Sequence, residues 1–312
     1  MSAIQKSTGH AAVDRSMSWY EASARNRIRL LLDDGSFEEF IGPELREVSP
    51  HLAVFDLPAQ FDDGIVVGRG TLDGAPVFVA AQEGRFMGGA FGEVHGAKLT
   101  GLLRAARDTG SVPVLILFDT GGVRLQEANA GELAIAEIMR AVIEARSAGV
   151  KVIGLVGGRA GCYGGGGLIA GCCSALAVSE QGRIAVSGPE VIETNRGVEE
   201  FDARDRAMVW RTMGGKHRRL IGGAEIFVDD TGQDFRDAAL TLLGSVGTFG
   251  LDTLKAEQAR LEDRLKRFGT CADATDIWTA EGAPDAGSIP GMPAEPFIAL
   301  AGKIGSSSRD AR

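Results

Sequence analysis

Apolar residues along this chain follow two patterns: short unbroken runs, and longer stretches in which they recur every three or four positions. The unbroken runs at residues 113–118 and 150–156 predict strands that are buried on both faces. Residues 131–147, between them, have the spacing of an amphipathic helix. A strand, a helix and a strand in this order predict a right-handed crossover in a parallel sheet.

The same patterns predict further elements on both sides of this unit. On its N-terminal side we expect a helix over residues 19–32, strands over 65–72 and 77–82 joined by a turn at Asp73-Gly74, and a helix over 93–107. On its C-terminal side we expect a helix over 168–173, strands over 175–178, 183–186 and 226–228, and a charged helix over 251–268. Residues 190–219 form a charged segment, and four prolines after Gly282 predict an irregular tail.

This order of elements predicts one large α/β domain over residues 19–282, since 312 residues that are 44% hydrophobic can bury a sizeable core. A flexible N-terminus over residues 1–18 would precede the domain. Residues 283–312 would form a Pro- and Gly-rich tail that is either docked on a partner chain or disordered.

Composition limits the partners and the compartment. A net charge of −9 and only 6% aromatic residues disfavour nucleic acids and anionic membranes as partners. No apolar run approaches the roughly 20 residues of a membrane span, and the polar residues 1–19 lack the apolar core of a signal peptide. The cysteines form no CxxC pair, so we expect reduced structural thiols and no bound metal; they are Cys162, Cys172, Cys173 and Cys271. These features predict a cytoplasmic protein.

Glycines concentrate in two turns that follow predicted buried strands. Gly164–Gly167 lie between a strand and a small-residue helix, and Gly121-Gly122 follow the strand at 113–118. Glycine leaves backbone N–H groups accessible, and a helix N-terminus adds unsatisfied donors and partial positive charge. Such turns bind an anion, either a phosphate or the oxyanion of a reacting thioester, unless the glycines serve only to let helix and strand pack closely.

Other chemistries lack their motifs. The glycines at 154–161 do not have the one-three-six spacing of a dinucleotide-binding turn, and there is no GxxxxGK[ST] loop, so an NAD-dependent oxidoreductase is not favoured. No GxSxG sequence accompanies the histidines. A Cys162–His95 pair is geometrically conceivable but has no specific sequence support.

One compact basic cluster stands out in this acidic chain. It consists of Lys216, His217, Arg218 and Arg219. It is either a solvated face or a landing site for an acidic partner, such as a carrier protein or the phosphates of a coenzyme A arm.

Four segments, in family order, resemble the carboxyltransferase branch of the crotonase-like superfamily. Residues 33–40 (DDGSFEEF) are similar to its LLDPGSFEE signature, and residues 86–98 (FMGGAFGEVHGAK) to its GGSMGEVVGEK loop. Residues 119–127 (DTGGVRLQE) and 188–193 (GPEVIE) are similar to SGGARMQE and GPRVIE. The resemblance fades after about residue 230. It implies the ClpP/crotonase fold, a ββα superhelix, here with an N-terminal helix and an extended C-terminal tail.

Details within that branch resemble the beta subunits of biotin-independent malonate decarboxylases. The chain lacks the four-cysteine zinc ribbon of many acetyl-CoA carboxylase beta subunits, and it departs from the carboxylases at Asp119-Thr120 and at Gly164–Gly167. The resemblance implies decarboxylation of a malonyl thioester to an acetyl thioester and CO2. The thioester would be carried on the phosphopantetheine-type group of an acyl-carrier protein, with no biotin and no cofactor bound by this chain.

The resemblance also implies site residues. Gly165 and Gly166 align with the Gly-Gly of the carboxyltransferase loop and would be the main oxyanion donors, with Gly121 and Gly122 as second choices. Substrate-binding candidates are Tyr163, Arg124, Gly164, Gly88 and Gly89. Core packing is the alternative role for the tyrosine, and a salt bridge to Glu127 or Glu93 is the alternative for the arginine.

Carboxyltransferases place their site between two crotonase-like halves, and this chain has the length of one. The resemblance therefore implies an obligate heteromer with a homologous gamma subunit, an acyl-carrier protein and an acyl-carrier transferase. Two alternatives remain open, a carboxyltransferase subunit of a biotin-dependent acyl-CoA carboxylase and a non-catalytic scaffold subunit.

Overall fold

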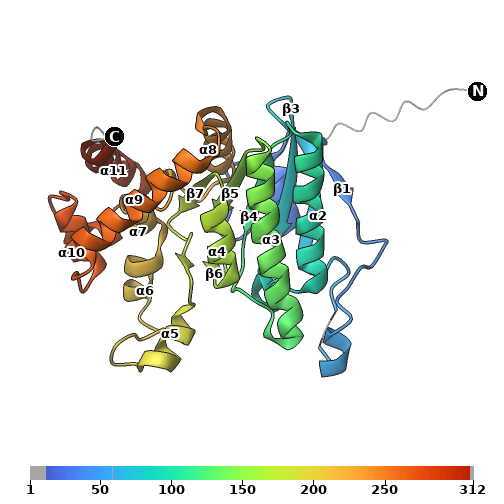
Figure 1. Cartoon of the computed structure of the whole chain (residues 1–312), viewed down its shortest axis with the longest axis horizontal. Helices are drawn as coiled ribbons and strands as arrows, with labels where there is room; N and C mark the ends of the chain where they lie inside the picture. The colour runs from blue at the N-terminus through green and yellow to red at the C-terminus, as the bar shows by residue number, and fades with distance from the viewer. Residues whose placement is uncertain (1–11, 58, 310–312) are drawn as a thin grey trace, which may run out of the picture.

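The computed structural model describes residues 12–57 and 59–309. Its central feature is a seven-stranded sheet in the order β1-β2-β3-β4-β5-β7-β9, beside a small parallel pair, β6-β8 (Figure 1). The strands are β1 (Glu38–Phe40), β2 (Ile65–Leu72), β3 (Ala75–Gln82), β4 (Val114–Phe118), β5 (Val152–Val156), β6 (Cys162–Tyr163), β7 (Ala175–Ser179), β8 (Ile184–Ala185) and β9 (Ile226–Val228). β1, β2 and β3 pair antiparallel, whereas β3, β4, β5, β7 and β9 run parallel.

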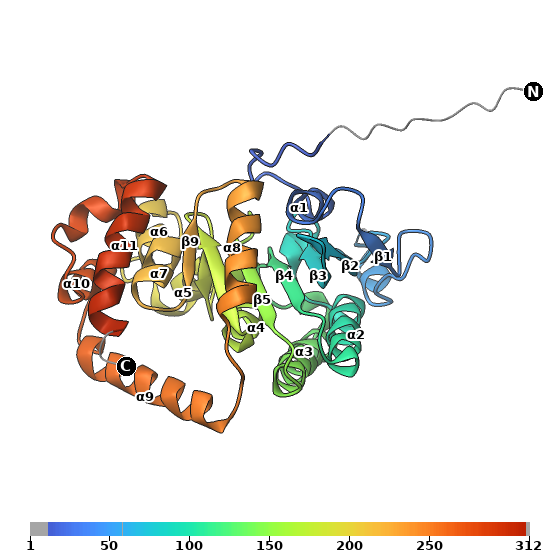
Figure 2. The same cartoon turned by 90° about the horizontal axis from the view of Figure 1, so that it is seen from above.

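Helices cover both faces of the sheet, which explains why its central strands are apolar throughout. Every residue of β4, β5 and β7 is buried, as predicted for β4 and β5 from their unbroken apolar runs. Figure 2 shows α1 (Ala24–Leu31) and α8 (Gly232–Ser245) on one side of the sheet. On the other side lie α2 (Glu93–Thr109), α3 (Asn129–Ser147) and α4 (Gly165–Cys172).

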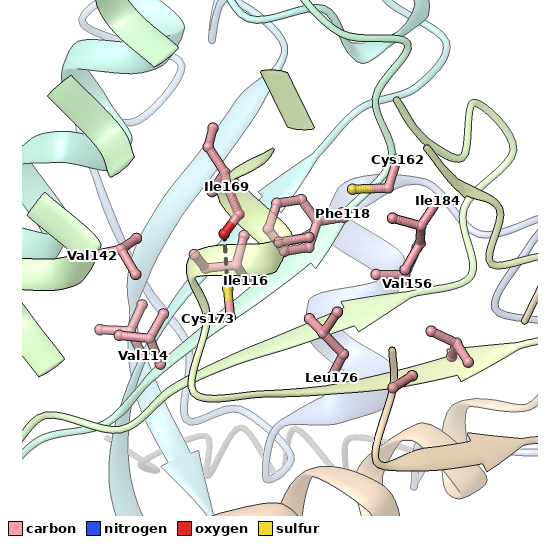
Figure 3. Packing of buried hydrophobic residues seen from close by; sticks show 14 of the residues in the cluster. Val114, Ile116, Phe118, Val142, Val156, Cys162, Ile169, Cys173, Leu176 and Ile184 are labelled. Atoms are coloured by element: carbon pink, nitrogen blue, oxygen red, sulfur yellow. Dashed lines mark hydrogen bonds between the residues drawn. The ribbon is translucent and has the colours of Figure 1, made fainter. Parts of the chain in front are cut away.

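The core on the α2–α4 side also accommodates two cysteines (Figure 3). Cys162 is fully buried and Cys173 is 7% exposed, with its thiol directed at the carbonyl oxygen of Ile169. Burial raises the pKa of both thiols well above the ordinary value. They are free, protonated packing groups, as the sequence predicted.

The charged segment at 190–219 is helical. It contains α5 (Pro189–Arg196), α6 (Arg206–Met213) and α7 (Gly215–Leu220), none of which was predicted. β1 and α8 were also not predicted, and the first helix begins at Ala24 rather than at residue 19.

The predicted irregular tail is wrong. After α9 (Leu251–Phe268), the chain forms α10 (Ala274–Ala280), a 3-10 turn at Ala286–Gly291 and α11 (Ala294–Arg309). Phe297 and Ile289 are fully buried, and they belong to the same apolar core as the sheet. The domain therefore continues past residue 282 at least as far as these residues.

The prediction of a flexible N-terminus also needs correction for residues 12–18, the part of that segment that the structure describes. The carbonyl oxygens of Arg15 and Met17 accept hydrogen bonds from the N–H groups of Gln233 and Gly232, at the start of α8. The Arg15 side chain donates to the carbonyl oxygens of Leu30 and Leu32. Residues 1–11 lie outside the described part of the chain. No helix within residues 12–57 and 59–309 has the length and apolarity needed to cross a membrane.

Candidate active site

The turn at Gly121-Gly122 meets the turn at Gly164–Gly167. The backbone N–H of Thr120 donates to the carbonyl oxygen of Gly161 at 2.8 Å, and that of Tyr163 donates to the carbonyl oxygen of Thr120 at 3.0 Å. These bonds align the segment after β4 with the segment that leads into α4. A Cβ added to Gly122 would lie 3.5 Å from the Cα of Gly164, so the two turns are in van der Waals contact.

The N-terminus of α4 begins at a residue that only glycine tolerates well. Gly164 has φ 55° and ψ −129°, and the first intrahelical bond runs from the N–H of Leu168 to its carbonyl oxygen. The N–H groups of Gly165, Gly166 and Gly167 precede that bond, so the helix itself offers them no acceptor. N–H groups at a helix N-terminus that have no intrahelical acceptor can bind a developing oxyanion.

Gly165 and Gly166 also let α4 pack closely. A Cβ at Gly165 would lie 2.4 Å from Ile135 Cδ1 on α3, and one at Gly166 would lie 2.4 Å from Thr120 Cγ2. These glycines therefore do allow close packing, which does not decide whether packing is their only role. Because packing uses the Cα side and anion binding would use the N–H, the predicted donor role remains compatible with it.

Gly121 and Gly122 are poorer donors than predicted. The N–H of Gly121 donates to the carbonyl oxygen of Gly88 at 2.7 Å, and the N–H of Gly122 donates to Thr120 Oγ1 at 3.1 Å. Both amides are already used to shape the turn. Their role in this structure is to line and position the site.

A cavity of about 360 Å³ opens beside the turn at Gly121. Its lining comes from the loop at residues 87–90 and the segment at residues 121–126, and consists of Met87, Gly88, Ala90, Gly121, Val123, Leu125 and Gln126. Gly88 and Gly89 have φ values of 63° and 67°, so the loop that carries them depends on glycine. A Cβ at Gly89 would collide with the Asp119 carbonyl oxygen at 1.8 Å. Gly88 thus lines the cavity, whereas Gly89 is buried against the end of β4.

Arg124 does not face the cavity. Its side chain is fully buried, and its Nη1 pairs with Asp63 at 3.0 Å and with Glu127 at 2.7 Å. Its predicted substrate contact is therefore wrong, and the alternative salt bridge to Glu127 is confirmed. Burial raises the pKa of Asp63, and the guanidinium of Arg124 opposes this increase. The pair fixes the loop that lines the cavity to the start of β2.

Tyr163 packs into a small apolar cluster with Val209 and Met213 of α6, as its alternative role predicted. The Arg183 guanidinium lies 5.8 Å from its ring centroid. Within the described residues its buried hydroxyl has no hydrogen-bond partner, and burial raises its pKa.

The sequence analysis missed two buried polar groups, Asp119 beside the glycine turns and Lys98 near the start of β2. Asp119 Oδ2 accepts from Arg27 Nη1 at 2.7 Å, and its Oδ1 accepts from the N–H of Ala160 at 2.6 Å. Lys98 Nζ donates to the carbonyl oxygens of Asp62 and Ile65. Both could have been found from the sequence as ionisable residues in apolar surroundings. Asp119 directly follows the apolar strand β4, and Lys98 lies within the apolar face of α2.

Cys162 and His95 do not form a nucleophile–base pair. The His95 ring contacts Gln82 through Nε2 and the Asp63 carbonyl oxygen through Nδ1, and burial lowers its pKa to about 3. With the Cys162 thiol also held neutral by burial, neither group is prepared for nucleophilic catalysis.

The basic cluster at 216–219 is not an exposed landing patch. Lys216 is 5% exposed, and its Nζ donates to the carbonyl oxygens of Pro290 and Met292 and pairs with Glu180. His217 Nδ1 accepts from Trp278 Nε1 at 3.2 Å, and burial lowers the pKa of this histidine to about 3. Arg218 donates to the Ile184 carbonyl oxygen, and both Arg218 and Arg219 are half-buried. The landing-site interpretation failed because the C-terminal helices fold over α7 and bury Lys216 and His217.

Comparisons with known proteins agree with this architecture. A family model described as the carboxyl transferase domain matches residues 21–215, and the chain belongs to this family of enzymes. Malonyl-S-ACP:biotin-protein carboxyltransferase MADC of Malonomonas rubra is 38% identical, over 92% of this chain and 96% of that protein. A crystal structure of a Pseudomonas malonate decarboxylase hetero-tetramer in complex with malonate contains a chain with 38% identity and a TM-score of 0.78; the match covers 85% of this chain and 97% of that chain.

The propionyl-CoA carboxylase beta chain of Saccharopolyspora erythraea is 34% identical over 60% of this chain, and the match spans only 34% of that longer protein. The predicted crotonase-type fold and the resemblance to malonate decarboxylase subunits are confirmed by these matches.

Proposed function

We propose that this chain is the beta subunit of a malonate decarboxylase, which converts a malonyl thioester on an acyl-carrier protein into an acetyl thioester and CO2. The observation that carries the proposal is the first turn of α4. Its three glycine N–H groups have no acceptor within the helix, and it contacts the cavity-lining turn at Gly122.

The chemistry needs stabilisation of an anion more than it needs a nucleophile. When the bond between the carboxylate and the central carbon breaks, its electron pair forms an enolate whose charge lies on the thioester oxygen. Two backbone donors directed at that oxygen would bind it more strongly as the charge grows, which lowers the barrier. A proton then adds to the former central carbon and gives the acetyl group. Neutral, buried Cys162 and His95 are consistent with a reaction that forms no acyl-enzyme.

The proposal includes a homologous partner subunit. Elements that border the site expose large apolar side chains, which a partner would cover; they are Leu125, Leu133, Leu168, Val186 and Val191. The similar Pseudomonas chain was crystallised in a hetero-tetramer. In the proposed complex the acyl-carrier protein delivers the thioester on its own prosthetic group, a separate subunit charges the carrier, and this chain binds no cofactor. The complex would work in the cytoplasm.

Transfer of the carboxyl group to biotin is the second candidate, because the Malonomonas rubra relative is a biotin-protein carboxyltransferase by name. It would pass through the same enolate, and only the fate of CO2 differs. A scaffold role, with the partner carrying out the chemistry, is the third.

The experiment measures CO2 release from malonyl-thioester carrier protein by the chain purified with its co-expressed partner, in the presence and absence of avidin. Malonyl-CoA in place of the loaded carrier identifies the thioester bearer. Release that avidin does not affect is the expected result. Release blocked by avidin would reassign the chain to biotin-dependent transfer, and no release from either thioester would contradict the proposed activity.

A further inference from the structure

Helix α9 presents an apolar stripe to solvent. It spans Leu251–Phe268, and none of its 18 residues is buried. Leu265 is 73% exposed and Leu251 is 66% exposed. Single exposed leucines are ordinary on protein surfaces, but here they form a regular series. In Figure 2 the helix runs along the outer edge of the molecule.

The spacing of the series is that of a coiled coil. Positions 251, 254, 258, 261, 265 and 268 alternate steps of three and four, and they hold Leu, Leu, Gln, Leu, Leu and Phe. These are successive a and d positions of a heptad repeat. The side chains that attach α9 to the rest of the chain lie on a different flank, where Arg264 is half-buried and Arg267 pairs with Glu281 at 2.7 Å.

We propose that the α9 seam pairs antiparallel with the same helix of a second copy of this chain. The seam is self-complementary in that direction. Leu251 meets Phe268 of the second copy, Leu254 meets Leu265, and Gln258 meets Leu261, each layer combining an a position with a d position. The second half of the contact repeats the first by two-fold symmetry.

Charges beside the seam favour the antiparallel direction. Antiparallel pairing places Lys255 opposite Glu262 of the second copy, whereas Glu257 pairs with Arg260 of its own chain at 2.5 Å. Parallel pairing in register would instead place Glu257 opposite Glu262, two like charges. Within its own chain Glu262 accepts a hydrogen bond from Gln258, through Oε1. An 18-residue helix is only about 27 Å long, so the pairing should be weak and reversible.

Sedimentation equilibrium of the full chain, alone and with its co-expressed partner, tests the seam from micromolar to millimolar concentrations. We expect a reversible dimer whose dissociation constant rises at least about 100-fold in Leu254→Ala/Leu265→Ala, because four leucine side chains leave the contact. Alanine keeps the helix propensity, and the leucines are exposed, so the thermal unfolding midpoint should not change.

A charge exchange tests the direction. Lys255→Glu should weaken the dimer about 10-fold, since two symmetric contacts become repulsive, and Lys255→Glu/Glu262→Lys should restore it. Lys266→Glu makes the same charge change away from the seam and is the matched control. A wild-type chain that stays monomeric at all concentrations would overturn the proposal. A dimer whose dissociation constant does not change with these substitutions would overturn it as well. If the seam variants no longer bind the co-expressed partner but self-associate as the wild type does, the proposal is overturned and the seam is assigned to that partner.

Discussion

At the scale of single residues, the glycines and charges of the site divide into those that shape it and those that can act in it. The N–H groups of Gly121 and Gly122 already donate hydrogen bonds within the loops that form the turn. Arg124 is enclosed by carboxylates. The first turn of α4 retains N–H groups that the helix does not use. Buried ion pairs hold this arrangement together.

The Arg27–Asp119 pair gives a direct test. Its side chains are 1% and 3% exposed, and Asp119 also caps the N–H of Ala160 next to the site. Asp119→Ala leaves a buried guanidinium without its counter-charge and should reduce the free energy of unfolding by about 3–5 kcal/mol. Urea denaturation measures this change. Glu38→Ala removes one member of the exposed Arg69–Glu38 pair and should cost less than about 1 kcal/mol; equal losses in both variants would contradict the assignment.

The sequence predicted which loops meet but not which of their atoms are already bonded. Strand ends and the resemblance were enough to identify the segments that carry Gly88, Gly121 and Gly166. They could not reveal that Gly88 accepts from the N–H of Gly121, or that Lys216 would be covered, because both facts depend on contacts between distant segments. Side-chain roles therefore failed more often than backbone positions.

At the scale of elements, predictions held where the pattern was long or uniform. β2, β4, α2 and α3 follow from apolar periodicity to within a few residues. The irregular tail was wrong because proline was counted as a helix breaker throughout. Pro296 lies in the first turn of α11, where its missing N–H costs no intrahelical hydrogen bond. The helices α5–α7 were missed because each spans only six to eight residues, too few to show a clear helical period. Helix α8 is longer, has Phe235, Ala238, Ala239 and Leu242 on one face, and could have been found.

The packing of α11 can be tested by two adjacent substitutions. Phe297 is fully buried and contacts Phe227 edge to face at 4.6 Å between ring centroids. Phe297→Ala should reduce the free energy of unfolding by about 3–5 kcal/mol, because the large cavity cannot fully collapse. Ile298 is 46% exposed, and Ile298→Ala should cost much less. A small and equal effect of both would show that α11 does not belong to the core.

At the scale of the whole molecule, the site lies at the border of the chain rather than inside it. Its cavity is formed by two loops, and the elements around it expose leucines and valines. The match to the propionyl-CoA carboxylase beta chain covers 34% of that longer protein. The remaining wall of the cavity would come from the proposed partner.

The most direct test of the account compares CO2 release by complexes that carry Gly166→Ala, Thr120→Ser/Gly166→Ala, or the control Gly171→Ala. A Cβ at Gly166 meets only one atom at close range, Thr120 Cγ2 at 2.4 Å, so alanine must displace the first turn of α4 unless serine removes that methyl group. Serine keeps the hydroxyl that binds the N–H of Gly122, and a Cβ at Gly171 meets nothing within 4 Å.

We predict that Gly166→Ala lowers the rate about 100-fold, as expected when catalytic donors shift by about 1 Å. The double variant should recover most of the rate, and the control should match the wild type, with all complexes assembled. Equal rates in all four proteins would contradict an enolate held at the N-terminus of α4.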